Sequence, residues 1–448
     1  MKLGPPAKPR RFGRVGGYAA AGGNGIKVTC RIIATSAKMW FFPGATGVIV
    51  CELASPQRRI RANATADSPG KGSMEKSDKR VDAPSWAING RFLTQRMTGV
   101  QRYAHEIVAA LDAILSQGND GAGVAAMRLV VPPGVGERPT LAKIAVCETG
   151  FGSGHAWDQF VLPLYAGAGI LSLGNFGPIL GPNHIVCIHD ANTFIQPESY
   201  SRAFGMTYRT LLPLVGRRAR RVATVSRFSA NALVQHGVCR AEKIFIAPNG
   251  HEHALRWDAT RASSPVIGAL KRPYIMLLGS SAKHKNIDII LKQARGLDEA
   301  GIDIVVVGAS SGIFAADTPA AVHQSNIHRA GYVGDDDLAA LYEGALCLVF
   351  PSRTEGFGIP PLEAMARGCP VISSNAASLA EVGGDAVIYV GPDDADRWRD
   401  AVIGLSTNPD LRAAMAAKGR KQATLFSWKR SAQLYIEEIS RLRQAPAR

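Results

Sequence analysis

The sequence predicts an α/β fold built from two Rossmann-like domains, each a parallel sheet covered by helices. Short apolar runs that indicate buried strands alternate along the chain with helical patterns, and this alternation is typical of parallel sheets. The length of 448 residues is enough for two or three domains with buried cores. The clearest single unit is residues 346–368, where an apolar run, a glycine loop and a helix with prolines in its first turn follow one another.

Residues 346–368 also form a candidate ligand site. The loop before Pro360 and Pro361 leaves free backbone N–H groups at the positive end of a helix dipole, where an anion can bind. Glu355 and Glu363 flank the loop, and carboxylates accept hydrogen bonds from sugar hydroxyl groups. The pattern therefore suits a ligand that carries both phosphate and hydroxyl groups, with plain acidic capping of the helix as the alternative.

Two further loops follow predicted strands. In the first domain, residues 185–188 indicate a buried strand that ends at His189 and Asp190, and open α/β sheets bind ligands at that end. A lone histidine is more often structural, so the assignment depends on this position. In the second domain, Lys283 and Lys285 lie between a predicted strand and a helix N-terminus, which suits a phosphate. A solvated basic loop is the alternative there.

Most of the positive charge lies in the first 80 residues. They hold 15 of the 52 Lys and Arg residues and 4 of the 36 Asp and Glu residues, hence +11 of the net +16. Their apolar residues show no sustained helix or strand periodicity, so we expect a disordered extension that is not part of the natural product. A basic tail that touches anionic lipid and a targeting peptide are the alternatives. The remainder is only mildly basic, which disfavours a nucleic-acid partner.

Cysteine spacing and hydropathy argue against a metal-binding protein and against a membrane-spanning protein. The seven cysteines are scattered without the spacing of a metal site, so we expect no metal and a reducing compartment. No apolar run reaches the length of a membrane span, because the best candidate, residues 39–51, is interrupted by Pro43 and two glycines. We expect a cytoplasmic protein, either free or peripherally bound to the inner face of the plasma membrane.

The segment E-G-F-G-x-P-x-L-E-A-M-A-x-G-x-P-V-I resembles the glutamate–seven–glutamate signature of retaining glycosyltransferase family 4. That family has the GT-B fold, in which two Rossmann-like domains face each other across a cleft and a C-terminal helix crosses back to the first domain. The order of motifs extends the resemblance over about residues 85–440. It implies four parts of the chain, namely the extension 1–80, an acceptor domain 81–265, a nucleotide-sugar domain 266–427, and a crossover helix and tail 428–448.

The resemblance also implies roles for single residues. Glu355 would hold the donor sugar, Glu363 the ribose, and His189 would lie against the sugar, so His189 and Glu355 are the catalytic candidates. An arginine common in the family is replaced by Ser280, which leaves the charge of the diphosphate to Lys285, with Lys283 beside it. The donor-binding candidates are Gly99, Ser226, Lys283, Lys285, Tyr332, Val333, Phe357, Gly358, Ile359 and Glu363.

The implied reaction is transfer of a hexose from a nucleotide sugar to a saccharide or polyprenyl-linked acceptor, with retained configuration and without metal or cofactor. The stretch from His189 to Asn249-Gly250 resembles bacterial polysaccharide mannosyltransferases, which favours GDP-mannose. UDP-glucose is the alternative donor. The alternative of another class is a basic nucleic-acid-binding or membrane-binding protein without catalysis, and salt-dependent oligonucleotide binding would indicate it.

Overall fold

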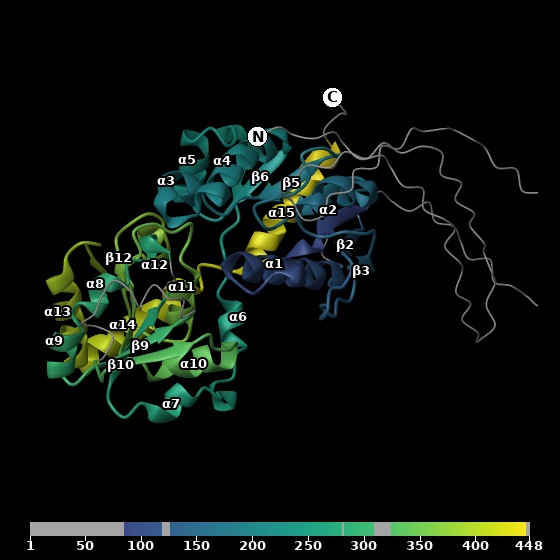
Figure 1. Ribbon diagram of the computed structural model, residues 1–448. Helices are drawn as coiled ribbons and strands as arrows, with labels where there is room; N and C mark the ends of the chain where they lie inside the picture. Colours follow the sequence, from purple (N-terminus) through teal and green to yellow (C-terminus); the bar gives the residue numbers. More distant parts are fainter. Residues whose placement is uncertain (1–84, 119–125, 280–281, 309–323, 445–448) are drawn as a thin grey trace, which may run out of the picture. The chain divides into compact units, whose positions relative to one another are not determined.

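The computed structural model describes residues 85–118, 126–279, 282–308 and 324–444. The predicted extension 1–80 and Ser280 lie outside these ranges. Within them the chain forms two parallel sheets with helices on both (Figure 1). The predicted α/β fold class, with two Rossmann-like sheets, is therefore confirmed.

The first sheet has seven strands among the described residues, in the order β3-β2-β1-β4-β5-β6-β7, and every neighbouring pair is parallel. Its strands are β1 (Trp86–Asn89), β2 (Met127–Val131), β3 (Ala145–Glu148), β4 (Gly169–Ser172), β5 (His184–Cys187), β6 (Arg221–Thr224) and β7 (Ile244–Ile246). The helices of this part are α1 (Gly99–Ser116), α2 (Gly154–Phe160), α3 (Asn192–Ile195), α4 (Arg202–Arg218), α5 (Arg227–Gln235) and α6 (Glu252–Leu255).

The second sheet has six described strands in the order β10-β9-β8-β11-β12-β13, again all parallel. They are β8 (Tyr274–Leu278), β9 (Asp303–Val307), β10 (Ile327–Gly331), β11 (Cys347–Phe350), β12 (Val371–Ser374) and β13 (Val387–Val390). The helices around them are α7 (Pro265–Ala269), α8 (Asp288–Leu291), α9 (Ala294–Glu299), α10 (Asp335–Gly344), α11 (Ile359–Ala366), α12 (Leu379–Gly383), α13 (Ala395–Ser406) and α14 (Pro409–Ala423). Both sheets therefore reverse their strand order once, between β1 and β4 and between β8 and β11.

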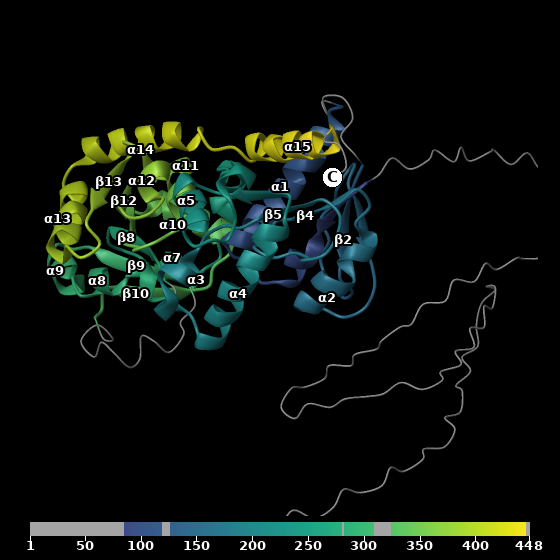
Figure 2. The ribbon, with the colours of Figure 1, turned by 90° about the horizontal axis from the view of Figure 1, so that it is seen from above.

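The last helix, α15 (Trp428–Gln444), returns to the first part of the chain, as predicted. It packs on α1, whereas α14 packs on α11, and Figure 2 shows the two helices following each other in yellow. The Tyr103 hydroxyl of α1 lies 2.8 Å from the Tyr435 hydroxyl of α15, so the contact is polar as well as apolar. None of the described helices is long and apolar enough to cross a bilayer.

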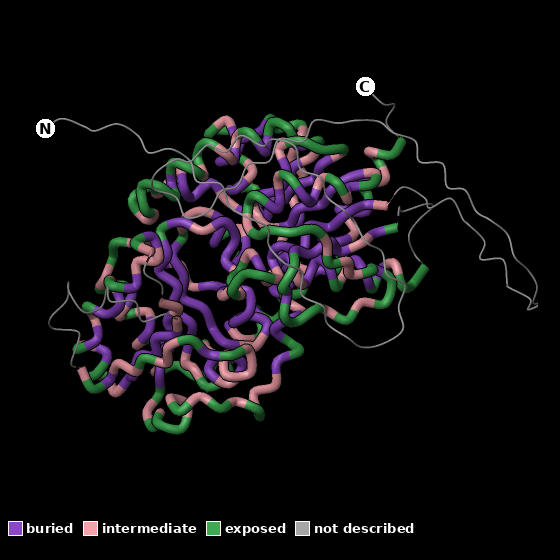
Figure 3. The backbone as a smooth tube through the Cα atoms, turned by 45° about the vertical axis from the view of Figure 1, so that its right-hand side comes forward, coloured by how far each residue is buried: buried purple, intermediate pink, exposed green. Residues whose placement is uncertain are grey.

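The core lies along the strands, most of which are buried. Figure 3 shows the buried residues of the chain in purple. The two strands that sequence reasoning missed, β3 and β10, are the end strands of their sheets and are partly exposed. An edge strand needs no continuous apolar run, so neither carried the pattern that identified the others.

The sequence also predicts helical structure at residues 157–165 and Asp335 as the N-cap of the helix that follows it. The first segment is helical but divided, because α2 ends at Phe160 and a separate 3₁₀ turn follows, with Pro163 near its start. Asp335 is not the cap of α10 but its first residue, and Gly334 occupies the cap position. The Asp335 carboxylate instead pairs with Arg102 of α1.

Candidate functional site

The candidate site begins where the second sheet reverses its strand order. β8 and β11 are neighbours there, and the loops that leave their C-terminal ends carry Lys285 and Glu355. Open α/β sheets bind ligands at such a reversal, because the two loops diverge and leave a space between them. The two predicted loops are thus brought together by the strand order and not by sequence distance.

Lys285 and Glu355 contact each other directly. The Lys285 ammonium donates a hydrogen bond of 2.7 Å to Glu355 Oε1, and the two side chains are 24% and 12% exposed. Each charge therefore compensates the other. A negatively charged ligand that takes Lys285 would free Glu355 to accept hydrogen bonds from hydroxyl groups.

Asp190 brings a second carboxylate to the same place from the first sheet. One of its oxygens accepts the Asn192 N–H at 2.8 Å. Burial raises the pKa of Asp190, and the nearby Glu355 charge raises it further, while Lys285 lowers it. A side chain at Gly356 would meet the His189 carbonyl oxygen at 2.7 Å, so only glycine allows this close approach between the two parts.

His189 follows β5 and is buried. Its Nε2 lies 2.9 Å from the Leu173 carbonyl oxygen, and burial lowers the pKa of the imidazole to about 4. A carbonyl oxygen only accepts, so Nε2 carries the proton and Nδ1 keeps a lone pair. Asn175 and Ser229 hold the backbone N–H and carbonyl of His189. The structure therefore presents His189 as a fixed, neutral ring.

Serine side chains hold the carbonyl groups of the loop that carries Glu355. The Gly356 carbonyl accepts a hydrogen bond of 2.6 Å from Ser226, and Ser229 Oγ lies 3.0 Å from the same oxygen. Ser378 lies 2.9 and 3.0 Å from the carbonyl oxygens of Glu355 and Phe357. With these carbonyls bound, the loop has a defined conformation before any ligand arrives. Ser226, which caps α5, therefore supports the loop from behind.

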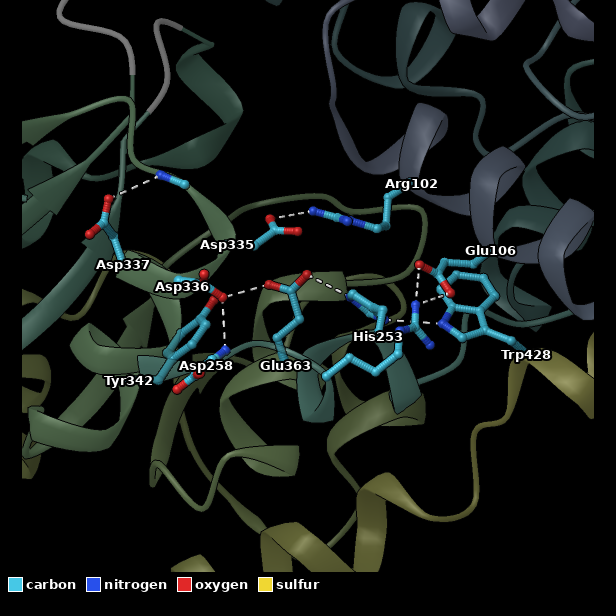
Figure 4. A network of polar contacts seen from close by, with 12 residues as sticks. Arg102, Glu106, His253, Asp258, Asp335, Asp336, Asp337, Tyr342, Glu363 and Trp428 are labelled. Carbon is cyan, nitrogen blue, oxygen red and sulfur yellow. Dashed lines mark hydrogen bonds and ion pairs between the residues drawn. The ribbon is translucent and has the colours of Figure 1, made fainter. Parts of the chain in front are cut away.

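Glu363 lies in α11 and is buried, with only 7% of its surface exposed. His253 Nε2 lies 3.0 Å from its Oε1, and the Tyr342 hydroxyl donates to its Oε2 at 3.2 Å (Figure 4). Both oxygens thus have a protein donor already. Each oxygen can accept a further hydrogen bond, so Glu363 remains a candidate for ribose hydroxyls.

The remaining predicted residues fall into three groups. Gly99 opens α1, and a side chain there would meet Ile359 at 3.2 Å, so these two lie together. Phe357 and Val333 are buried, and Gly358 has the positive φ of 105° that starts α11. Tyr332 and Lys283 are exposed, with the Arg96 guanidinium 4.3 Å above the Tyr332 ring.

Sequence reasoning missed His253, which is a partner of Glu363, and Trp428, which is a partner of His253. The Trp428 indole N–H donates to His253 Nδ1 at 3.1 Å, and both side chains are buried. The only local signal was a turn at Asn249-Gly250 and a helix start at Ser427. Nothing in either segment indicates that residues 175 positions apart meet.

Comparisons with known proteins agree with this geometry. Residues 261–422 match the family described as glycosyl transferases group 1. The O-antigen chain mannosyltransferase RfbU of Salmonella typhimurium is 29% identical over 233 residues, which are 51% of this chain and 62% of RfbU. The chain thus spans less than two thirds of this relative's length.

Among solved structures, WaaG, a glycosyltransferase involved in lipopolysaccharide biosynthesis, superposes with a TM-score of 0.59 at 17% identity, covering 80% of this chain and 99% of WaaG. Anabaena Alr3699/HepE, solved in complex with UDP and glucose, superposes with a TM-score of 0.55 at 16% identity over the same shares. Together with the two parallel sheets and the returning α15, these likenesses establish the GT-B fold.

Proposed function

We propose that this chain is a retaining hexosyltransferase that uses a nucleotide sugar, because residues 261–422 match the glycosyl transferases group 1 family. The observation that carries the proposal is the pair of Lys285 and Glu355 at the strand-order reversal of the second sheet. One of these groups suits a diphosphate and the other a sugar hydroxyl, and they lie 2.7 Å apart. A nucleotide sugar carries these two chemical groups side by side.

The reaction we propose breaks the bond between the sugar C1 and the diphosphate oxygen and forms a bond from C1 to an acceptor hydroxyl oxygen. The electron pair of the broken bond leaves with the diphosphate, whose charge is stabilised by Lys285 and by backbone N–H groups of the 355–359 loop. The acceptor proton passes to a leaving phosphate oxygen. Glu355 binds sugar hydroxyls in this scheme and forms no covalent bond.

His189 and Glu363 hold the two ends of the donor in this proposal. The backbone carbonyl of His189 lies against Gly356 in the loop that carries Glu355, and we assign its neutral imidazole, fixed by Leu173, to the sugar side of the donor. Glu363 accepts hydrogen bonds from the ribose, and Tyr332 and Val333 lie beside the base. Neither role requires a metal ion, and no group of His, Cys, Asp and Glu suited to a metal occurs among the residues that the structure describes.

The donor we favour is GDP-mannose, and the process is synthesis of a bacterial surface polysaccharide. RfbU, an O-antigen chain mannosyltransferase, supports this choice. UDP-glucose is the second candidate, because the neighbour Alr3699/HepE was solved with UDP and glucose. The acceptor in either case is a saccharide or a polyprenyl-linked saccharide.

An exposed face of the first part supports a lipid-linked acceptor and peripheral contact with an anionic membrane. α4 carries four arginines and no acidic residue, and Phe204 and Met206 are exposed on it. α2 lies next to it, because the Phe176 ring contacts both His155 and Tyr208, and it exposes Phe160. Exposed apolar side chains among arginines suit a surface of anionic lipid headgroups.

A thermal-shift screen of nucleotide sugars tests the proposed function. A ligand that binds only the native state raises the melting temperature, so GDP-mannose, UDP-glucose and their free diphosphates should be separable by the shift that each produces. Incubation of the stabilising donor with a lipid-linked saccharide should then give an α-linked product from an α-linked donor. An inverted product, or no shift with any nucleotide sugar, would contradict the proposal.

A further inference from the structure

The chain crosses between its two sheets twice, and the two crossing segments are fastened to each other. The outgoing segment is residues 247–255 and the returning segment is residues 426–431. The Trp428 N–H lies 3.2 and 3.1 Å from the two carboxylate oxygens of Glu252, and the Phe426 carbonyl accepts the His251 N–H at 3.2 Å. A side chain at Gly250 would meet the Trp428 nitrogen at 2.2 Å, so the two backbones are in contact.

One side chain of this junction reaches the candidate donor site. His253 is 1% exposed, accepts the Trp428 indole N–H at Nδ1, and lies 3.0 Å from Glu363 Oε1 through Nε2 (Figure 4). An indole N–H can only donate, so Nδ1 must be the accepting nitrogen. Nε2 then carries the single ring proton and donates it to Glu363. The contact with Trp428 therefore selects the tautomer of the ring.

We propose that His253 is a positioning residue that holds the Glu363 carboxylate in one orientation, in a tautomer that Trp428 selects. Tyr342 fixes the other oxygen of Glu363, so the lone pairs that remain have defined directions. The inference rests on the proposed function, because it assigns those lone pairs to the ribose of the donor. α15 begins at Trp428, so in this arrangement the position of α15 affects the contact between Glu363 and the ribose although α15 itself does not touch the nucleotide.

The ring nitrogens can be read without any ligand. Long-range ¹H–¹⁵N NMR of protein labelled at histidine should show the His253 Nδ1 as an unprotonated acceptor and the Nε2 as protonated. Trp428→Phe keeps an aromatic ring but removes the donor, so the His253 signals should move toward a mixture of tautomers. A wild-type ring already mixed, or protonated at Nδ1, would overturn the proposal.

The second measurement is the affinity for GDP, with UDP as a second probe, by calorimetry. Trp428→Phe should weaken binding about three- to tenfold, the scale of one misdirected hydrogen bond. Trp257→Phe is the matched control, because Trp257 touches the same imidazole edge-on at 5.3 Å and no hydrogen bond between them occurs in the described part of the chain. It should leave both the tautomer and the affinity unchanged. Equal losses in the two variants would reduce His253 to a packing role and overturn the proposal.

A second pair of variants covers the case in which Trp428→Phe does not fold. His253→Gln keeps a donor that can reach Glu363, whereas His253→Leu does not, so the glutamine variant should bind GDP more tightly than the leucine variant. Equal affinities would overturn the proposal. A wild-type protein that binds neither GDP nor UDP would contradict the proposed function instead, and the ring-nitrogen signals would still show whether Trp428 selects the tautomer.

Discussion

The two glutamates of the candidate site are held in opposite ways. Glu355 pairs with a charged lysine that is itself 24% exposed, so its partner can move to a ligand. Glu363 is held by two hydrogen-bonding side chains, His253 and Tyr342, in a buried network. The Glu355 carboxylate therefore becomes available to a ligand only when an anion binds Lys285. The Glu363 carboxylate, by contrast, is oriented by the protein alone.

This difference matches the chemistry proposed for each end of the donor. The diphosphate arrives with its own charge and can replace Glu355 as the partner of Lys285, which couples binding of the phosphate to release of Glu355. A ribose brings only neutral hydroxyls and cannot displace an ion pair at low cost, so its acceptor is best oriented in advance. Substitutions at either glutamate or at its partners should therefore have different consequences.

The largest effect is expected from Glu355→Gln. The variant keeps the size of the side chain but loses the charge that strengthens hydrogen bonds to sugar hydroxyls, so turnover should fall about 100-fold, the scale of one oriented polar contact to the reacting group. Lys285 loses its partner in the same variant, so GDP should bind at least as tightly as to the wild type. Initial rates and calorimetry give the two numbers, and near wild-type turnover would contradict the role of Glu355.

Glu363→Ala should act on stability as well as on affinity. It leaves the His253 and Tyr342 donors without an acceptor in a buried site, which should lower the free energy of unfolding by about 2–3 kcal/mol. Affinity for GDP should fall too. Urea denaturation would measure the first effect, with Glu355→Ala as the control, because the partly exposed lysine that it leaves can reach water. Equal losses of stability in the two variants would remove the contrast between the glutamates.

The contrast was not visible in the sequence, although most of the fold was. Buried strands such as β8 and β11 have continuous apolar runs, and capping residues such as Ser226 and Asp394 mark helix starts, so these elements could be predicted locally. Sequence reasoning assigned Glu355 to the donor sugar and Lys285 to the diphosphate, but it could not show that the strand order places the two side chains in contact. His253 meets Trp428 only because the chain crosses back, which no local pattern encodes.

Acid should weaken the native state through two buried histidines, one of them in the Glu355 region. Burial lowers the pKa of His189 and of His184 to about 4, against an ordinary value of about 6.5. The unfolded chain takes up these protons first, so the stability present above pH 6.5 is lost as the pH falls toward 4. Each histidine should contribute a loss of about 2 kcal/mol between pH 6.5 and 5.

Urea denaturation at pH 7, 6 and 5 would measure this slope. Asp190 works against it, because its pKa is raised and the native state takes up that proton more readily. His189→Gln and His184→Gln should each flatten the slope by a similar amount, but His184 lies at the other end of β5, so only His189→Gln should also lower turnover at pH 7. A slope unchanged in both variants would show that neither ring is held neutral.

Lys285→Ala removes the partner of Glu355 and should have a smaller effect than the changes described above. Affinity for GDP should fall about tenfold, the scale of one charge-assisted contact to phosphate, while affinity for guanosine should hardly change. Calorimetry with GDP and with guanosine measures the two affinities separately. A chelator should change neither the wild type nor the variant. Equal losses for GDP and guanosine would mean that Lys285 supports the fold and not the diphosphate.

The smallest effect is expected where the two parts meet through charges. Arg102 of α1 pairs with Asp335 of α10, and it lies 5.7 Å above the ring of Trp257, next to the linker that carries His253. Asp335 is 39% exposed, so the pair is screened by water, and Arg102→Gln should cost less than about 1 kcal/mol of stability. If Glu363 is oriented by His253 and Tyr342 alone, GDP affinity in this variant should equal that of the wild type at any salt concentration. A loss that grows as salt is lowered would mean that the charged contact between α1 and α10 also orients the ribose end, and the contrast with Glu355 would then be one of degree.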